Sequence, residues 1–109
     1  MASTYKVLGQ QNPSATTLTT LYTVPAATNT IVSTIMIANR SGTATAFRIS
    51  IAVAGAADND KQYIAYDVPI EGNEAFDFTI GATMAATDVI RVYATLASLS
   101  FSAFGSEIT

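Results

Sequence analysis

Apolar and polar residues alternate along most of this chain, in short runs that end at residues typical of turns. The clearest run is Thr45–Val53, where Phe47 and Ile49 fall on one parity and Arg48 and Ser50 on the other. Because successive side chains of a strand point to opposite faces of its sheet, this alternation predicts a strand with one face in a core. No segment keeps the 3.6-residue period of an amphipathic helix. The pattern therefore predicts an all-β chain.

Eight short strands are predicted in this way, most of them separated by segments that contain Gly, Pro, Asn or Asp. They are Thr4–Gly9, Leu18–Val24, Thr30–Asn39, Thr45–Val53, Gln62–Val68, Asn73–Ile80, Asp88–Thr95 and Ser98–Phe104. The segment Gly81–Thr87 is expected to form a loop or a helical turn. Eight strands with this spacing favour two packed antiparallel sheets, a β-sandwich or jelly roll, in a single domain over residues 1–109.

The core of this sandwich is predicted from the apolar residues on the inward parity of each strand. These are Leu21, Ile35, Ile37, Phe47, Ile49, Ile51, Phe76, Phe78, Ile90, Val92, Leu99 and Phe101.

One predicted strand, Thr30–Asn39, is apolar on both parities. Ile31, Ile35 and Ile37 fall on the parity assigned to the core, and Val32, Met36 and Ala38 fall on the other. In a two-layer sandwich this second face has no core to cover it. We therefore predict that these three residues belong to an interface with another chain.

The N-terminal strand is a second candidate for contact with a partner. Open sandwiches have edge strands, and only the three prolines of this chain offer an obvious means of blunting them. The segment Ser3–Gly9, which carries Tyr5 and Val7, is expected to be able to extend the sheet of a partner by β-augmentation.

The composition removes most of the residues that perform chemistry near neutral pH. The chain contains no His, Cys or Trp, and 12% of its residues are charged. We therefore predict no catalytic residues, no enzyme activity and no cofactor. Average chains carry about 25% charged residues, so the low fraction here favours a surface that partly faces other protein. The alternative is an ordinary β domain with a surface rich in Ser and Thr.

Charge and hydropathy also narrow the range of partners. The net charge of −3 and the scattered basic residues argue against nucleic acid, which needs a basic surface to neutralise its phosphates. The apolar stretch Ile31–Ala38 is far shorter than the roughly 20 residues that span a bilayer, so no membrane partner is predicted. The first residues lack the apolar core of a secretory signal, and the chain is expected to fold in a cytoplasm.

Two groups of carboxylates are candidates for a metal or catalytic site. The triplet Asp58-Asn59-Asp60 resembles part of a calcium loop, but calcium takes about six to eight oxygen ligands and the spacing of an EF-hand is missing. We predict a plain turn there and no metal site. The second group lies around a predicted hairpin and is interpreted as a solvated acidic surface. It consists of Asp67, Glu71, Glu74 and Asp77.

Two further patterns are weaker indications of a functional site. Tyr63 and Tyr66 are three residues apart on a predicted strand, so they are expected to point to opposite faces and to form no flat shelf for a sugar. At least one of them is expected in the core or an interface. The triplet Asn39-Arg40-Ser41 matches the N-glycosylation pattern, but without a secretory signal we interpret this match as coincidental.

Several segments, taken in their order along the chain, form a recognisable pattern of strands and turns. They are Tyr5–Gln10, Thr19–Ala26, Ala38–Ser41, Tyr63–Asp67, Asp88–Ala94 and the closing Phe-Gly-Ser-Glu-Ile. In this order, and over nearly the whole chain, they resemble a family of small virion structural proteins of tailed phages, especially phages of aquatic bacteria and cyanobacteria. The resemblance implies a location in the virion after assembly in the host cytoplasm. It carries no site motif, so no functional residues follow from it.

The composition and the resemblance together favour a capsid decoration (cement) protein that binds the exterior of the shell. Such a protein would be a homo-oligomer, with a trimer as the expected form, and would contact the major capsid protein. Many modest contacts, repeated by symmetry, would then resist the internal pressure of the DNA. One alternative is a tail, baseplate, adaptor or fibre-base subunit, and another is a module that binds glycans of the host surface.

Overall fold

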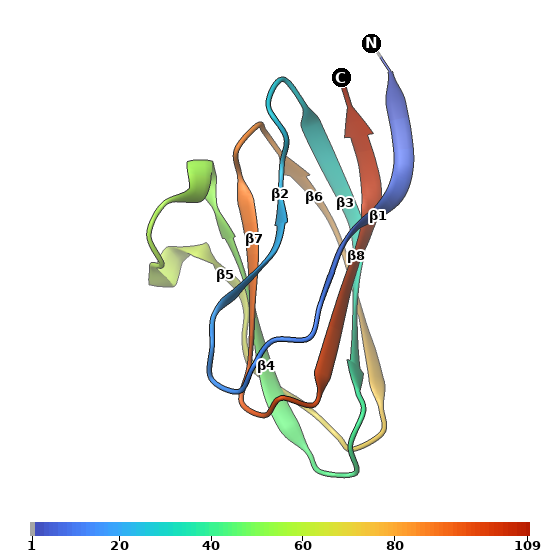
Figure 1. Cartoon of the computed structure of the whole chain (residues 1–109), viewed down its shortest axis with the longest axis vertical. Helices are drawn as coiled ribbons and strands as arrows, with labels where there is room; N and C mark the ends of the chain where they lie inside the picture. The colour runs from blue at the N-terminus through green and yellow to red at the C-terminus, as the bar shows by residue number, and fades with distance from the viewer. Residues whose placement is uncertain (1) are drawn as a thin grey trace.

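The computed structural model describes residues 2–109 and consists of eight β-strands in two four-stranded antiparallel sheets (Figure 1). The strands are β1 (Ser3–Gln11), β2 (Thr19–Thr23), β3 (Asn29–Asn39), β4 (Thr45–Ala52), β5 (Tyr63–Ile70), β6 (Ala75–Met84), β7 (Val89–Ala94) and β8 (Leu99–Ile108). Helical structure in this range is limited to two 3₁₀ turns, η1 (Val53–Gly55) and η2 (Asp60–Gln62). None of the helices described is long and apolar enough to cross a membrane. The predicted all-β fold is confirmed.

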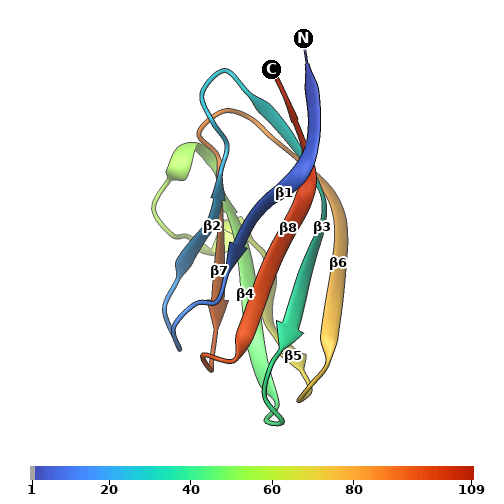
Figure 2. The same cartoon turned by 45° about the vertical axis from the view of Figure 1, so that its right-hand side comes forward.

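The order of the strands is that of a jelly roll. The first sheet has the order β1-β8-β3-β6 and the second the order β2-β7-β4-β5, and Figure 2 shows the two layers side by side. Strands β1 and β8, β2 and β7, β3 and β6, and β4 and β5 pair antiparallel. A long hairpin that rolls up into two layers produces this pairing, which is the eight-stranded jelly-roll arrangement. Both ends of the chain therefore lie at the same end of the sandwich (Figures 1 and 2).

The core lies between the two sheets. At its centre Phe47 and Phe101 are fully buried, with ring centroids 6.1 Å apart in an edge-to-face arrangement. Ile51 and Phe78 are partly buried and pack against the core. The other predicted core residues that are buried are Leu21, Ile35, Ile37, Ile49, Ile90, Val92 and Leu99.

The prediction that Phe76 belongs to the buried core is wrong. Its side chain is 37% exposed, although its ring packs at 5.6 Å from that of Phe47. The reason is its position on β6, which is an edge strand of the first sheet. An inward-pointing side chain on an edge strand has a neighbouring strand on one side alone, so solvent reaches it from the other side.

The prediction that Val32 shares a face with Met36 and Ala38 is also wrong. Val32 is fully buried, whereas its neighbour Ile31 is 39% exposed. The registers of β3 with both neighbouring strands shift between Val32 and Thr34, so β3 contains a bulge at this point. A bulge adds one residue to a strand and reverses the parity on its far side. Val32 therefore packs in the core and offers no exposed surface to a partner.

Each of the four edge strands has an irregular register. The pairing shifts at Leu8 in β1, at Leu21 in β2, at Ile64 in β5 and near Gly81 in β6. Bulges of this kind twist an edge and make it a poor template for another chain. The expectation that the prolines alone blunt the edges is therefore wrong. The segment expected to form a loop or helical turn from Gly81 instead continues β6 as far as Met84, with φ of 58° at Gly81.

The segment that connects β4 and β5 folds over part of the outer face of the second sheet. Arg91 fixes it by donating hydrogen bonds to the carbonyl oxygens of Ala56 at 2.8 Å and Gly55 at 3.2 Å. Gln62 is buried and donates to the carbonyl oxygen of Ala57 at 2.8 Å. Ser50 of β4 is fully buried as well.

Candidate functional site

The first candidate is a shallow groove on the outer face of the first sheet, near the end where both termini lie. The exposed apolar residues at this groove are Tyr5, Val7 and Ile31, with 84%, 48% and 39% of their surfaces accessible. Its volume is about 720 Å³. The register explains why these residues meet, since Tyr5 pairs with Ser106 and Ser106 pairs with Ile31. The groove is lined by Ser3, Tyr5, Lys6, Val7, Ile31, Ser33, Phe104, Gly105, Ser106 and Ile108.

The structure thus places the predicted interface residues in three different environments. Tyr5 and Val7 lie together in the groove. Met36 and Ala38 are half-buried and pair with Ser102 and Ser100 of β8, farther along the same sheet. Val32 is in the core. The prediction that Ile31 shares the face of Ile35 and Ile37 is wrong, because the bulge in β3 turns Ile31 outward and leaves no mark in the apolar pattern.

A second cluster lies on the outer face of the second sheet and joins β4, β5 and β7. The guanidinium of Arg48 lies between two tyrosine rings, 4.2 Å from the ring centroid of Tyr66 and 4.3 Å from that of Tyr93. Its Nε and Nη2 donate to the two carboxylate oxygens of Asp67 at 2.6 and 3.3 Å. These hydrogen bonds raise the pKa of Arg48. The cluster therefore holds Tyr66 in a fixed position at the surface.

Tyr63 and Tyr66 lie next to each other, so the prediction that they point to opposite faces is wrong. Their ring centroids are 5.1 Å apart and the rings are perpendicular, so they form a corner and not a flat shelf. The register of β5 with β4 shifts twice in this region, and Asp67 has φ of 51°. These irregularities break the simple alternation on which the sequence prediction depended. The two rings and Asp60 line a hollow of about 420 Å³.

The triplet Asp58-Asn59-Asp60 is held by hydrogen bonds within the chain. Asp58 accepts a hydrogen bond from the Tyr63 hydroxyl at 3.1 Å, and the Asn59 side chain accepts one from the backbone N–H of Lys61 at 3.2 Å. Burial, followed by the bond to Asp58, raises the pKa of Tyr63 to about 12. Within residues 2–109 no group of three or more acidic side chains has a geometry that could hold a metal ion.

The second carboxylate group does not act as one acidic surface. Asp67 is paired with Arg48 on the face of the sheet, whereas Glu71 and Glu74 lie at the turn that precedes β6. All four carboxylates are exposed, but the prediction that they surround one hairpin is wrong, because β5 belongs to the second sheet and β6 to the first.

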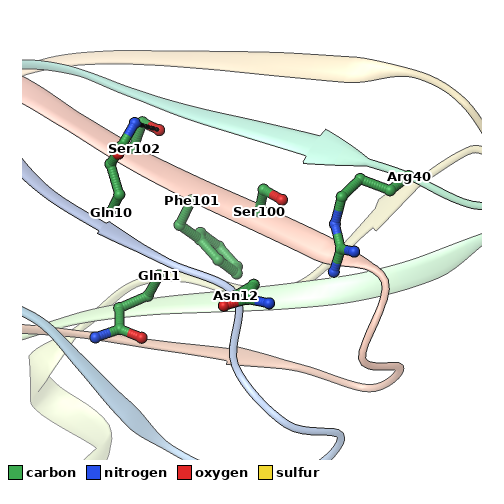
Figure 3. Close-up of a pocket in the computed structure, with 7 residues that line it drawn as sticks. All are labelled: Gln10, Gln11, Asn12, Arg40, Ser100, Phe101 and Ser102. Atoms are coloured by element: carbon green, nitrogen blue, oxygen red, sulfur yellow. Dashed lines mark hydrogen bonds between the residues drawn. The ribbon is translucent and has the colours of Figure 1, made fainter.

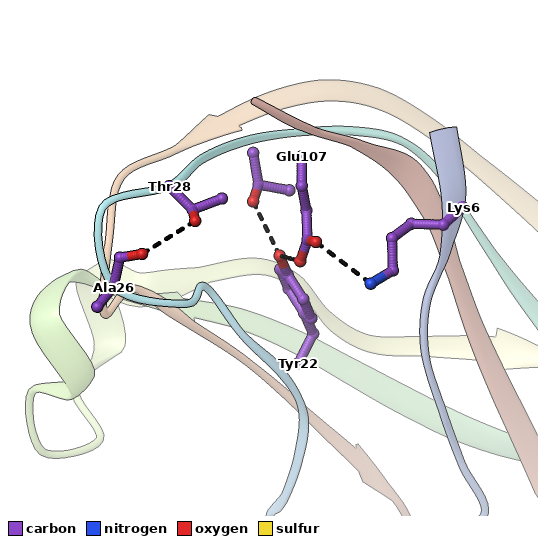
Figure 4. A network of polar contacts seen from close by, with 6 residues as sticks. Lys6, Tyr22, Ala26, Thr28 and Glu107 are labelled. Atoms are coloured by element: carbon purple, nitrogen blue, oxygen red, sulfur yellow. Dashed lines mark hydrogen bonds and ion pairs between the residues drawn. The ribbon is translucent and has the colours of Figure 1, made fainter. Parts of the chain in front are cut away.

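A network of polar groups joins the two sheets at the end near the termini (Figure 4). The Tyr22 hydroxyl lies 2.5 Å from Glu107 Oε2 and 2.8 Å from the Thr30 hydroxyl, and Lys6 Nζ lies 3.2 Å from Glu107 Oε1. The Tyr22 bond, more than the Lys6 bond, lowers the pKa of Glu107. Burial, together with Glu107, raises the pKa of Tyr22 to about 12. The network ties Lys6 down beside the apolar groove.

A third hollow, of about 350 Å³, lies where β1 leaves β8 (Figure 3). Its lining is polar apart from Phe101, and three of its side chains are already engaged in hydrogen bonds. Gln10 donates to the Ser102 hydroxyl at 3.3 Å, and Arg40 donates to the carbonyl oxygen of Ala97 at 2.9 Å. Its lining residues are Gln10, Gln11, Asn12, Arg40, Ser100, Phe101 and Ser102.

Asn39, the first residue of the glycosylation-like triplet, has a structural role. Its side chain is buried and donates to the carbonyl oxygens of Thr43 at 2.8 Å and Glu71 at 3.2 Å. Its Oδ1 accepts from the backbone N–H of Ser41. The triplet therefore organises the turn that follows β3.

The described residues thus offer an apolar groove and two smaller hollows as surfaces for binding. The chain matches no protein-family model and no curated protein sequence.

Proposed function

We propose that this chain is a structural protein of a tailed-phage virion, and that it decorates the exterior of the capsid. In this role it acts by contact alone, as an oligomer that binds copies of the major capsid protein. A trimer is the form that we expect. The structural observation that supports contact with other protein is the apolar groove on the outer face of the first sheet.

Two properties of this groove support a protein contact. Tyr5, Val7 and Ile31 expose apolar surface where a monomer would gain solubility from charge. Lys6 is the one charged residue among those that line the groove, and its ammonium is already paired with Glu107. The surface therefore has little charge to desolvate when it is covered. An uncharged apolar surface of the same kind, such as that of a second copy, is the partner that fits it best.

The fold is consistent with this role. Jelly rolls recur among viral capsid proteins, but they recur among lectins and enzymes too, so the fold alone assigns no function. The bulged edge strands favour contact through the sheet face over β-augmentation at β1. The contact with the capsid protein, the trimer and the location in the head rest on the sequence resemblance.

The experiment that tests this proposal is gold-labelled antibody against the chain on intact particles, with a count of copies per virion. Label over the whole head and hundreds of copies are the expected result. Label confined to the tail, with a few dozen copies or fewer, would instead assign the chain to the tail or baseplate. Particles without label would contradict a virion role altogether.

A further inference from the structure

We propose that the hollow between Tyr63, Tyr66 and Asp60 binds a neutral saccharide unit. The sugar would pack its C–H groups on the tyrosine rings and donate hydroxyl hydrogen bonds to the Asp60 carboxylate. The hollow lies on the second sheet, and the apolar groove lies on the first. A subunit docked through that groove would thus keep the hollow open. The inference is independent of the proposed virion role.

The rings are held in place before any ligand arrives. Tyr63 is fixed by its hydroxyl bond to Asp58 at 3.1 Å, and Tyr66 is fixed by the guanidinium of Arg48 at 4.2 Å. Tyr66 nevertheless remains 55% exposed. An exposed aromatic ring that is already ordered loses little conformational entropy when a ligand binds. The volume of about 420 Å³ lies within the usual range for small-molecule sites.

The charges around the hollow select the class of ligand. An anion would approach the carboxylates of Asp58 and Asp60, which repel it. A cation would compete with the guanidinium of Arg48 for the face of the Tyr66 ring, because Arg48 already lies over that ring. A neutral ligand avoids both penalties. It must still offer apolar area to the rings and hydrogen-bond donors to Asp60, and a sugar has both.

The test uses the full chain on an array of neutral oligosaccharides, followed by NMR titration with the sugars that bind. The ring protons of Tyr63 and Tyr66 are the probes, with choline and sulfate as the cationic and anionic comparisons. We expect the saccharide to shift these protons, and Tyr66→Ala to weaken binding by about tenfold or more through loss of stacking area. Tyr66→Phe keeps the ring and should bind within a few-fold of the parent.

Leu96→Ala is the control, because Leu96 is an exposed apolar residue between β7 and β8 that lines neither the hollow nor the groove, and it should bind as the parent does. Asp60→Asn should also weaken binding of the saccharide, and this variant leaves both tyrosine rings in place. The inference is overturned if no neutral saccharide shifts the two rings, or if Tyr66→Ala and Asp60→Asn both bind like the parent. It is also overturned if choline or sulfate shifts the rings more than any sugar does.

Discussion

The Tyr22 hydroxyl donates a 2.5 Å hydrogen bond to the carboxylate of Glu107 and so connects β2 of one sheet with β8 of the other. Tyr22 is 7% exposed, and its hydroxyl also contacts Thr30, which is buried at the same end of the core. The neutral phenol and the ionised carboxylate are the forms that this contact favours. The contact lowers the pKa of Glu107, and burial together with the contact raises the pKa of Tyr22.

The first prediction concerns the pH dependence of stability. The pKa of Glu107 lies below its ordinary value of 4.5, so its contribution is present above that value and is lost as the pH falls through the lowered pKa. The pKa of Tyr22 is raised from 10.0 to about 12, so its contribution is present below pH 10 and is lost as the pH rises towards 12. Urea unfolding should therefore give a plateau of stability between these limits.

Two variants test the acid limit and the alkaline limit of this stability plateau separately. Glu107→Gln should flatten the acid side of the stability profile. Tyr22→Phe should flatten part of the alkaline side, because the pKa of Tyr63 is also raised to about 12. It should also cost about 1–3 kcal/mol at neutral pH, since it removes a hydrogen bond to a charged group. An acid limb that is unchanged in Glu107→Gln would contradict the role of this contact.

The second prediction compares two phenylalanines that sequence alone places together in the core. Phe101 is fully buried against Phe47, whereas Phe76 is 37% exposed on an edge strand. Phe101→Ala should destabilise the fold by about 3–5 kcal/mol, because it leaves a cavity at the centre of the sandwich. Phe76→Ala should cost clearly less. Equal losses for both variants in chemical denaturation would contradict the assignment of β6 as an edge.

The third prediction concerns the place where β1 crosses β2. A Cβ atom at Gly9 would overlap the carbonyl oxygen of Leu21, which is backbone and cannot move aside cheaply. Gly9→Ala should therefore destabilise the fold by about 1–3 kcal/mol, as overpacking does. Gly42→Ala is the matched control, because the nearest atom to its Cβ is the Asn73 side chain at 3.7 Å. Thermal unfolding of both variants compares them, and a similar melting temperature for the two would be the contrary outcome.

The fourth prediction tests the apolar groove as a contact between copies. Val7→Lys places a charge in the groove and should dissociate the oligomer, while the circular dichroism spectrum stays that of the parent. Val53→Lys is the matched control, since Val53 is an exposed valine, at 71%, in the loop after β4. Light scattering measures the mass. A parent chain that stays at 11.4 kDa at high concentration would contradict self-association in solution.

The fifth prediction is that removing divalent metal leaves the melting temperature unchanged. Asp58 and Asn59 are already hydrogen-bonded within the chain. A bound ion at 100 times its Kd would add about 2.7 kcal/mol, which corresponds to a rise of about 11–22 °C in the melting temperature of a small domain. Scanning calorimetry with EDTA and with added calcium measures the difference. A calcium-dependent rise of that size would show that the loop is a cation site.

The alternation of apolar and polar residues determined the fold class and most of the core. It succeeded in β4 and in the second half of β3, where every second residue meets the opposite sheet. Phe47, Ile49, Ile35 and Ile37 are fully buried there, as their parity predicts. Parity is a local property of an extended chain, so it can be read from neighbours in the sequence.

The pattern fails where a strand is bulged or lies at an edge. The extra residue in β3 places Val32 in the core, and the shifts in β5 bring Tyr63 and Tyr66 into contact. A bulge depends on how a strand pairs with its neighbours, and the burial of a side chain such as Phe76 depends on which strand lies beside it. These are relationships between segments far apart in the chain, and no local pattern records them.

Both candidate surfaces follow from such relationships. Tyr5 and Val7 were predicted as contacts from their strand, but Ile31 joins them only because β8 lies between β1 and β3. Arg48, Tyr66 and Tyr93 come together only because β4 lies between β5 and β7. The sequence by itself determined that this chain forms an all-β fold of two antiparallel sheets. The tertiary structure decided which side chains meet on its two outer faces, because strand order and bulges set those meetings.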